Sequence, residues 1–484
     1  MNDKNAKVGK YKYLFNNLAL FSISNFVSKI LVFLLVPFYT NVLSTADYGI
    51  ADVMQTTLLL LVPALTINMG EAALRFGIDR SDKRSDILRI GIKYVTIAAL
   101  IVLAGAAVTL PFVRGDIRVY LMLFVILFAT NCTYEFMILF FQGCEQVRIV
   151  VVGSVLSTFV LLVSNILFLL VFRLGLNGYL FSQMIAYTLA VLIMLFIARY
   201  LCPEIYMRSA DKDCEFEKEL LDYGRPMIVY STSSFINNAA DRYLVALLKG
   251  VAVNGVYGVA YKIPAILTVF QRIFAQAWQM SATKSYEDEK SDEFFSTMYT
   301  IYNSFMVIGS AVLILLVRLV AAFLFRKDFY EAWRFVPPLL ISVVFGALTG
   351  FLGSICLAHK DSRAMGIATG TGAVVNIVLN LILIPGYGAM GAAIATGISY
   401  FVMYFMAFNK VKRYVKLKVG LLRDYLAYVL LIVQAVIMIM GDAVLGSDVA
   451  VYVVSAVLVL VLLIMYFREA VKIADKFLER IRKK

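Results

Sequence analysis

Residues 22–51, SISNFVSKILVFLLVPFYTNVLSTADYGIA, align without a gap on residues 231–260, STSSFINNAADRYLVALLKGVAVNGVYGVA. The two stretches are identical at nine positions, including the Tyr-Gly pair at 48–49 in the first and 257–258 in the second. A second match at nearly the same spacing pairs Gly175, Gly178, Ile185 and Tyr187 with Gly388, Gly391, Ile398 and Tyr400. The chain is therefore predicted to contain two copies of one structural unit.

The composition around this repeat is that of an integral membrane protein. Of the 484 residues, 61% are hydrophobic and 16% are charged, and the mean hydropathy is +0.83. Soluble domains have about 45–50% apolar and about 25% charged residues. With one histidine and five cysteines that form no C-x-x-C pair, zinc sites and histidine-based catalysis are not expected. We expect no enzyme activity, no metal and no cofactor.

Stretches of about 20 apolar residues, enough to cross a bilayer, occur throughout the chain. Fourteen spans are predicted: Leu14–Phe38, Tyr48–Met69, Ile90–Leu110, Val119–Phe141, Ile149–Phe172, Tyr179–Ala198, Met227–Leu248, Val256–Met280, Tyr299–Leu324, Phe335–Leu357, Ala364–Ile384, Met390–Phe408, Tyr425–Met440 and Val449–Phe467. With a cytoplasmic N-terminus, most of the 45 Lys and Arg residues fall in inner segments, as the positive-inside rule requires. Both termini are therefore predicted to be cytoplasmic, and the net charge of +13 is assigned to inner loops rather than to nucleic-acid binding.

The repeat has a period of six spans, and an even number gives both copies the same orientation in the membrane. Parallel repeats in transporters place the substrate path between the halves. We therefore predict a six-helix bundle in residues 1–210, a second in 211–410, and an additional helix pair with a basic tail in 411–484. The fold class is all-α, with two parallel-repeat bundles.

Charged residues within the predicted spans point to the substrate. Lys29 and Arg272 lie ~13 and ~12 Å from the nearer span ends, and Arg242 and Lys262 lie ~9 Å from theirs, at 1.5 Å per residue. Cations at such depth are costly in lipid and normally face a wet cavity or a carboxylate. Together with Arg75, expected at the cytoplasmic mouth, these four residues predict a cationic cavity for an anionic ligand. Lys93 and Arg318 lie nearer to span ends, where they can snorkel to the interface.

Three carboxylates, Asp52, Glu135 and Asp241, also fall within predicted spans. Each either pairs with a cation or couples transport to a proton or sodium ion. Asp241 and Arg242 are expected to be coupled to each other. Arg242 then either ties helices together through an acid or serves the substrate, and the sequence leaves both open.

Four stretches resemble the Wzx-type polysaccharide flippases, which belong to the superfamily that includes lipid II flippases and MATE drug exporters. They are LVPFYTNVLSTADYGIADV from Leu35, YGRPMIVYSTSSFINNAADRYLVALLKG from Tyr223, FAQAWQMSATKSYED from Phe274, and NIVLNLILIPGYGAMGAAIATGISY from Asn376. The D-R-Y at 241–243 and the A-W at 277–278 are the most specific part. The family's cationic cavity matches the deep cations in character, without a residue-by-residue equivalence.

The resemblance implies a V-shaped cavity between two six-helix bundles in the bacterial inner membrane. The implied substrate is an undecaprenyl-diphosphate-linked oligosaccharide for O-antigen or capsule assembly, and the implied partners are a polysaccharide polymerase and glycosyltransferases. A lipid II flippase and a MATE-like exporter of cationic drugs are the alternatives. An exporter of cationic drugs would be expected to have mostly acidic residues in its cavity. In this sequence the cations deep within the spans outnumber the acids, which argues against that alternative. A membrane enzyme such as a polymerase would normally bring larger polar loops than the longest predicted connection, residues 199–226.

Overall fold

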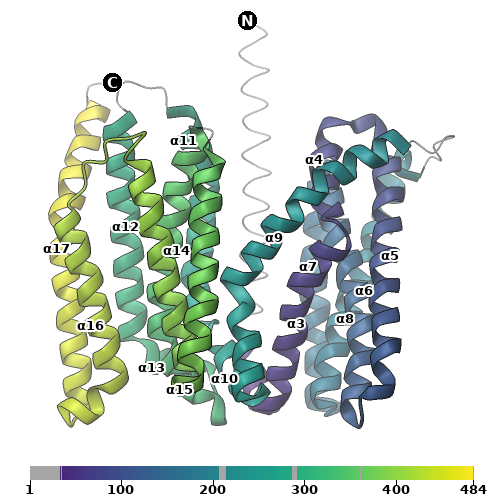
Figure 1. Ribbon diagram of the computed structural model, residues 1–484, viewed down its shortest axis with the longest axis horizontal. Coiled ribbons are helices and arrows are strands. Elements are labelled where there is room, and N and C mark those ends of the chain that lie inside the picture. The colour runs from purple at the N-terminus through teal and green to yellow at the C-terminus, as the bar shows by residue number, and fades with distance from the viewer. Residues whose placement is uncertain (1–32, 34, 207–213, 286–290, 360, 483–484) are drawn as a thin grey trace, which may run out of the picture. The chain divides into compact units, whose positions relative to one another are not determined.

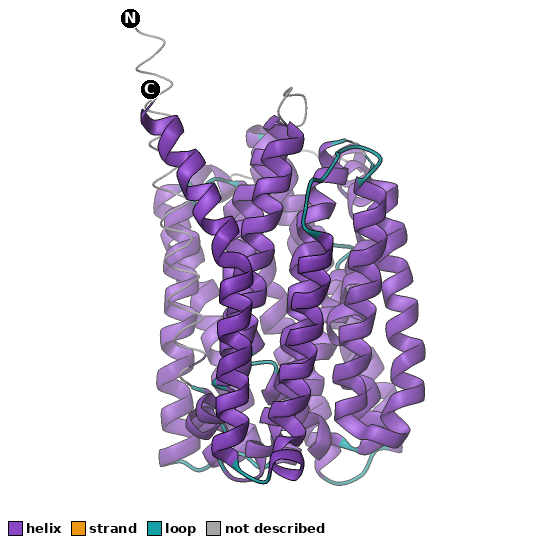
Figure 2. Cartoon of the chain, turned by 90° about the vertical axis from the view of Figure 1, so that its left-hand side faces the viewer, coloured by secondary structure: helices purple, strands orange, loops and turns teal. Residues whose placement is uncertain are grey.

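The computed structural model describes residues 33, 35–206, 214–285, 291–359 and 361–482. In these residues helices make up all the regular structure and no strand occurs (Figure 2). The chain is a multi-pass membrane protein with the predicted all-α fold class. Its contacts divide it into two compact units, with the division inside α9 between Phe235 and Ile236.

Unit 1 is a bundle whose long helices run side by side (Figure 1). Its helices are α2 (Val36–Val42), α3 (Thr45–Leu65), α4 (Met69–Asp79), α5 (Arg84–Thr109), α6 (Asp116–Gly143), α7 (Val147–Asn165), α8 (Gly175–Leu201) and the first part of α9 (Cys214–Lys249). Short 3-10 helices lie at Ser81–Lys83, Leu110–Phe112 and Pro203–Tyr206, and a π-helical segment, Ile166–Val171, continues α7.

The start of α3 follows directly from its sequence. The Ser44 hydroxyl oxygen accepts a hydrogen bond from the backbone N–H of Asp47 at 3.0 Å, and the Asp47 carboxylate accepts one from the backbone N–H of Ser44 at 3.4 Å. This reciprocal capping satisfies donors that the first turn of a helix leaves without partners.

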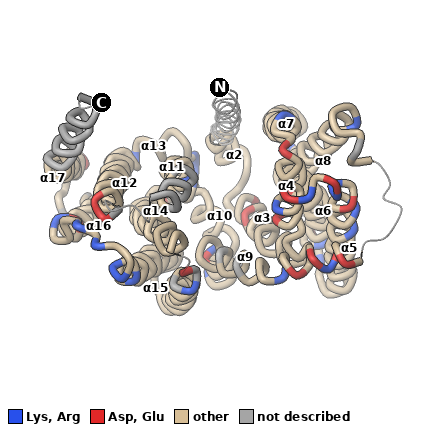
Figure 3. The backbone as a smooth tube through the Cα atoms, turned by 90° about the horizontal axis from the view of Figure 1, so that it is seen from above, with Lys and Arg blue, Asp and Glu red and all other residues tan. Residues whose placement is uncertain are grey.

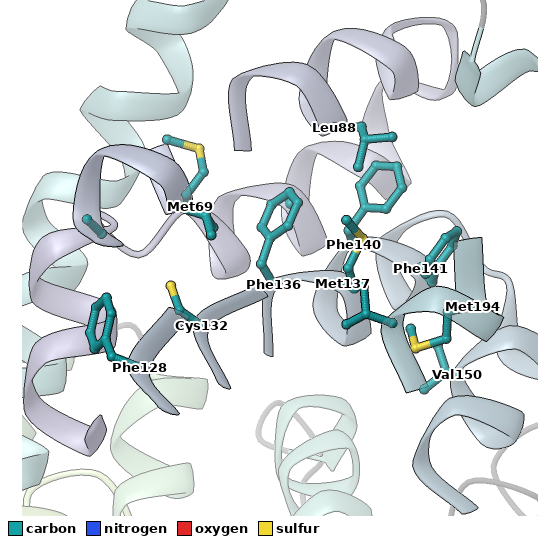
Figure 4. Close-up of a cluster of buried hydrophobic side chains, with 14 of the residues drawn as sticks. Met69, Leu88, Phe128, Cys132, Phe136, Met137, Phe140, Phe141, Val150 and Met194 are labelled. Carbon is teal, nitrogen blue, oxygen red and sulfur yellow. The ribbon is translucent and has the colours of Figure 1, made fainter. Parts of the chain in front are cut away.

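Aromatic side chains of α6 fill the centre of unit 1 (Figure 4). Phe128, Phe136, Phe140 and Phe141 are all buried, and the rings of Phe136 and Phe140 stack at 6.0 Å. Gly91 of α5 makes room for Phe136, because a Cβ at position 91 would lie 1.9 Å from Cζ of that ring. The absence of a side chain at Gly91 therefore sets how closely α5 approaches α6.

The first turns of α9 are anchored to unit 1. Glu217 accepts hydrogen bonds from Lys93 Nζ at 2.6 Å and from the Tyr94 hydroxyl at 2.8 Å, and Phe216 is buried against Phe76 at a ring distance of 6.0 Å. The hydrogen bond from Lys93 lowers the pKa of Glu217 below its ordinary value. This anchoring explains why the contacts divide the chain beyond residue 210, where the sequence analysis places the boundary. Lys93 thus has a carboxylate partner and does not simply snorkel.

Unit 2 is a second helical bundle (Figure 1). It contains the rest of α9, then α10 (Val251–Ala260), α11 (Pro264–Ser285), α12 (Ser291–Leu315), α13 (Val317–Leu324), a 3-10 segment (Lys327–Phe335), α14 (Val336–Ala358), α15 (Ser362–Val411), α16 (Leu421–Leu445) and α17 (Asp448–Arg482). α15 is two helices joined at Gly388, whose φ of 59° and ψ of −139° are non-helical. Because Gly accepts a positive φ without steric cost, the chain reverses there, between predicted spans 11 and 12.

The additional helix pair, α16 and α17, packs within unit 2 on α12. Arg318 Nη1 lies 2.7 Å from Asp448 Oδ1 at the start of α17, and its Nη2 donates to the carbonyl of Met438 at 2.8 Å. The Arg318 guanidinium also lies 4.5 Å from the Trp333 ring centroid. Arg318 is therefore buried in an ion pair that fastens the helix pair to unit 2, and it does not snorkel as the sequence analysis expected.

Ten helices of the described residues are long and apolar enough to span a membrane. The bent pair α10 and α11, with an angle of 51° between Val251–Ala260 and Pro264–Ala275, brings this number to eleven. The predicted count of fourteen is not confirmed. Most of the first predicted span, Leu14–Phe38, lies outside the described residues, and α15 counts once although two spans were predicted within it. The membrane part of α9 is too polar to be counted.

Candidate functional site

Asp241 is the centre of a buried polar cluster in unit 2. Its side chain is 3% exposed, and Oδ2 accepts hydrogen bonds from the hydroxyls of Tyr257 at 2.6 Å, Tyr261 at 2.5 Å and Thr396 at 3.2 Å. Oδ1 accepts the backbone N–H of Arg242 at 2.9 Å. A buried carboxylate is tolerated when donors surround it in this way.

The amide side chains of α15 extend the cluster. Asn376 Nδ2 lies 3.4 Å from the hydroxyls of both Thr396 and Ser399, which belong to the other limb of the helical hairpin. Asn380 Nδ2 donates to Asn376 Oδ1 at 2.9 Å. All four side chains are buried. Carboxylate, hydroxyl and amide oxygens of this kind suit a proton or a hard cation.

Arg242 lies beside this cluster, and Lys262 directly follows Tyr261 in the sequence. The Arg242 guanidinium is 4.4 Å from the ring centroid of Tyr261, so Tyr261 uses its hydroxyl for Asp241 and its ring for Arg242. Stacking occupies the face of a guanidinium, whereas its five N–H donors lie in its plane and match phosphate geometry. The expected coupling of Asp241 and Arg242 thus has a physical route through one tyrosine.

The break between α10 and α11 brings Tyr261 and Lys262 to this place. Both residues are half-buried, and they lie between Ala260, where α10 ends, and Pro264, where α11 begins. Proline disfavours helical geometry in the residue before it, which explains the break at Ile263. The Lys262 N–H donates to the Val259 carbonyl at 2.9 Å. A broken helix at a polar site is the arrangement that many transporters use for binding.

The other predicted site residues lie elsewhere. Arg272 is exposed on α11 of unit 2, further along from Lys262. In unit 1, Arg75 on α4 is 58% exposed and pairs with Asp79 at 3.2 Å. Asp52 is buried on α3, and Glu135 is exposed on α6. Lys29 lies outside the described residues.

The side chains that bind Asp241 were not among the residues predicted from the sequence. Tyr257 and Tyr261 are spaced one helical turn apart, and so are Asn376 and Asn380, which is the signal that was available. Thr396 gave no such signal, because a single threonine is common in an apolar helix and only the α15 hairpin brings it to Asp241.

A protein family matches this chain in sequence, and solved structures match it in fold. The family described as polysaccharide biosynthesis protein matches residues 14–279, more than half of the chain. No curated protein sequence matches it. Among solved structures, the lipid II flippase MurJ in an inward closed conformation has a TM-score of 0.68 at 14% identity, covering 94% of this chain and 100% of that chain.

Two transporters of the MATE type are also similar. An inward-facing multidrug resistance MATE family transporter of the MOP superfamily has a TM-score of 0.64 at 14% identity, covering 80% of this chain and 95% of its own. The MATE transporter ClbM, solved in complex with Rb+, has a TM-score of 0.54 at 16% identity, covering 84% of this chain and 96% of its own. At these identities the similarity shows a shared fold.

Proposed function

The chain belongs to the polysaccharide biosynthesis protein family, and from this premise we propose that it is a flippase for undecaprenyl-diphosphate-linked oligosaccharides. It moves the repeat unit from the cytoplasmic to the outer leaflet of the bacterial inner membrane by alternating access. Both termini lie in the cytoplasm in this proposal. Glycosyltransferases supply the substrate and a polysaccharide polymerase consumes it.

The observation that carries this proposal is Arg242 beside the Asp241 cluster, with Lys262 next to Tyr261 in the sequence. The Arg242 guanidinium lies over the ring of Tyr261, which orients it. Lys262 is the next residue after Tyr261, at the break between α10 and α11. Guanidinium and ammonium groups neutralise a diphosphate through charge-assisted hydrogen bonds without a covalent step.

Lys29, Arg75 and Arg272 complete the proposed binding set. Arg75 and Arg272 are exposed, which makes each accessible to an anionic headgroup. Arg75 has a neighbouring carboxylate in Asp79, so its proposed contribution is to attract the substrate at the entrance rather than to hold it. Lys29 is included for its charge and predicted depth alone.

Asp241 is the first candidate for ion coupling. Its carboxylate sits among hydroxyl and amide oxygens in a buried site, and the ring of Tyr261 links it to Arg242. A proton or a sodium ion that binds Asp241 would weaken the hold of the carboxylate on Tyr261 and so alter the position of Arg242. Asp52 and Glu135 are the corresponding candidates in unit 1.

The test is transport of a defined substrate in reconstituted vesicles. Purified protein should flip a diphosphate-linked oligosaccharide, and Arg242→Gln and Lys262→Gln should slow flipping by about 10- to 100-fold each, because a hydrogen bond to a charged group is worth about 1.5–3 kcal/mol. Arg334→Gln, which removes an exposed cation paired with Glu331, is the control. Transport of lipid II but not of other diphosphate-linked glycans would favour the lipid II alternative, and export of cationic drugs alone would favour the MATE-like one.

A further inference from the structure

The connector between α15 and α16 carries a basic strip that the proposed transport site does not use. Residues 410–423 contain six cations and no acid. Lys410 pairs with Asp361 at 3.3 Å, and Arg423 pairs with Asp424 at 2.9 Å. The remaining four, Lys412, Arg413, Lys416 and Lys418, are exposed and are called the connector strip below. In Figure 3 the connector shows as a run of blue beside α15 and α16.

None of these four cations has a carboxylate at ion-pair distance among the residues that the structure describes. The Lys412 ammonium contacts neutral groups instead, the Asn409 side-chain oxygen at 3.3 Å and the Phe408 ring at 4.9 Å. The strip therefore presents a local excess of positive charge. Positive charge alone is enough to keep a loop on the cytoplasmic side of the membrane, so the charge by itself does not indicate a binding site.

The connector backbone, however, is held in one conformation. The backbone N–H of Lys416 donates to Asp292 at 3.2 Å, and that of Lys418 donates to Ser296 at 2.8 Å. The Tyr414 hydroxyl donates to Asp361, and its ring stacks on His359 at 4.9 Å. Burial alternates along the segment, so that Val415 is buried while Lys416 and Lys418 both point outward. A preorganised array of cations loses less entropy when it binds an anion.

An apolar surface continues from the strip along α16. Leu422 is 76% exposed, and Leu426, Val429 and Val433 are also exposed. Their spacing of four, three and four residues places them on one face of the helix. Cations at the membrane surface that lead into an apolar stripe match a lipid headgroup with its acyl chains.

We propose that the connector strip binds an anionic phospholipid of the leaflet that the positive-inside rule assigns to the cytoplasm. The phosphate lies among Lys412, Arg413, Lys416 and Lys418, and the acyl chains lie along the exposed face of α16. Clusters of four to eight cations next to a membrane helix recognise anionic lipids in this way, through attraction to the negative surface. The site does not depend on the proposed transport function, because it uses none of the proposed substrate-binding residues.

The test is lipid binding to the purified full-length protein, measured by native mass spectrometry or by thermal stabilisation in detergent. Phosphatidylglycerol and phosphatidylcholine are the probes. The strip variant replaces all four cations with glutamine. The control replaces Arg80, Arg89, Lys218 and Arg225, four cytoplasmic-side cations of unit 1 outside the proposed site, and so changes the net charge equally.

Each cation near the surface contributes about fivefold in affinity, and salt screens part of this. We expect the strip variant to bind phosphatidylglycerol at least about tenfold more weakly, with phosphatidylcholine unchanged and the control within about twofold of the unmodified protein. A milder variant, with Lys412, Lys416 and Lys418 replaced by arginine, should bind normally and shows whether the fold is intact. Equal losses in strip and control variants would overturn the proposal. Competition by inorganic phosphate at the same concentration would also overturn it, since the site would then recognise a free anion.

Discussion

Tyr261 joins the two charged groups of the candidate site, and two substitutions separate its roles. Tyr261→Phe removes the hydroxyl that donates to Asp241 and leaves the ring beneath Arg242. A hydrogen bond to a charged group contributes about 1.5–3 kcal/mol. Because Tyr257 and Thr396 still donate to the same oxygen, we expect the free energy of unfolding to fall by about 1.5 kcal/mol, the lower end of that range.

Tyr261→Leu removes the ring as well. A cation–π contact contributes about 0.5–2 kcal/mol, so this variant should be less stable than Tyr261→Phe by about that amount, and Arg242 should lose its orientation. Denaturant unfolding in detergent measures the first effect, and flipping in vesicles measures the second. Flipping under an imposed potential without an ion gradient should be nearly normal in Tyr261→Phe, which keeps the ring beneath Arg242, and reduced about 2- to 30-fold in Tyr261→Leu. Tyr387, an exposed tyrosine of the same unit, provides matched control substitutions. If the two Tyr261 variants flip equally well, the ring does not position Arg242.

Two further predictions concern the carboxylates. Because the pKa of Glu217 is lowered, its anchoring contribution is present above its ordinary pKa of 4.5 and is lost as the pH falls through the lowered value. Cys214 is exposed while the other four cysteines are buried, so it can carry a spin label that reports on the start of α9. The label should become mobile in acid in the unmodified protein and should be mobile at every pH in the Glu217→Gln variant. The second prediction is tested by measuring flipping in vesicles with an imposed potential and no ion gradient, for the variants Asp52→Asn, Glu135→Gln and Asp241→Asn. The potential itself favours outward movement of negative charge by about 2.3 kcal/mol per charge per 100 mV. Unchanged flipping in all three variants would refute coupling through a carboxylate.

Local patterns predicted much of the fold. Long apolar stretches indicated the spans, and Gly388 between two of them marks the reversal inside α15. The charges of Asp241 and Arg242 within a predicted span indicated polar surroundings, which the structure shows for Asp241. These features depend on residues within one or two helical turns, which a single sequence displays directly.

Partners that are distant in sequence were not predictable in the same way. Thr396 reaches Asp241 across 155 positions, and Arg318 reaches Asp448 across 130. Both Lys93 and Arg318 were expected to snorkel, because a cation near a span end can be satisfied by the interface without a partner. Only the packing of the helices shows that a carboxylate is close enough to replace water.

The most direct test of the account is flipping of an undecaprenyl-diphosphate-linked oligosaccharide by the purified protein in vesicles, followed as the fraction of glycan accessible on each side. We predict that the protein flips this lipid, that Arg242→Gln and Lys262→Gln each slow flipping at least about tenfold, and that Arg334→Gln does not. A rate in the variants equal to that of the unmodified protein, or flipping no faster than in protein-free vesicles, would contradict the claim that these two cations carry the diphosphate across the membrane.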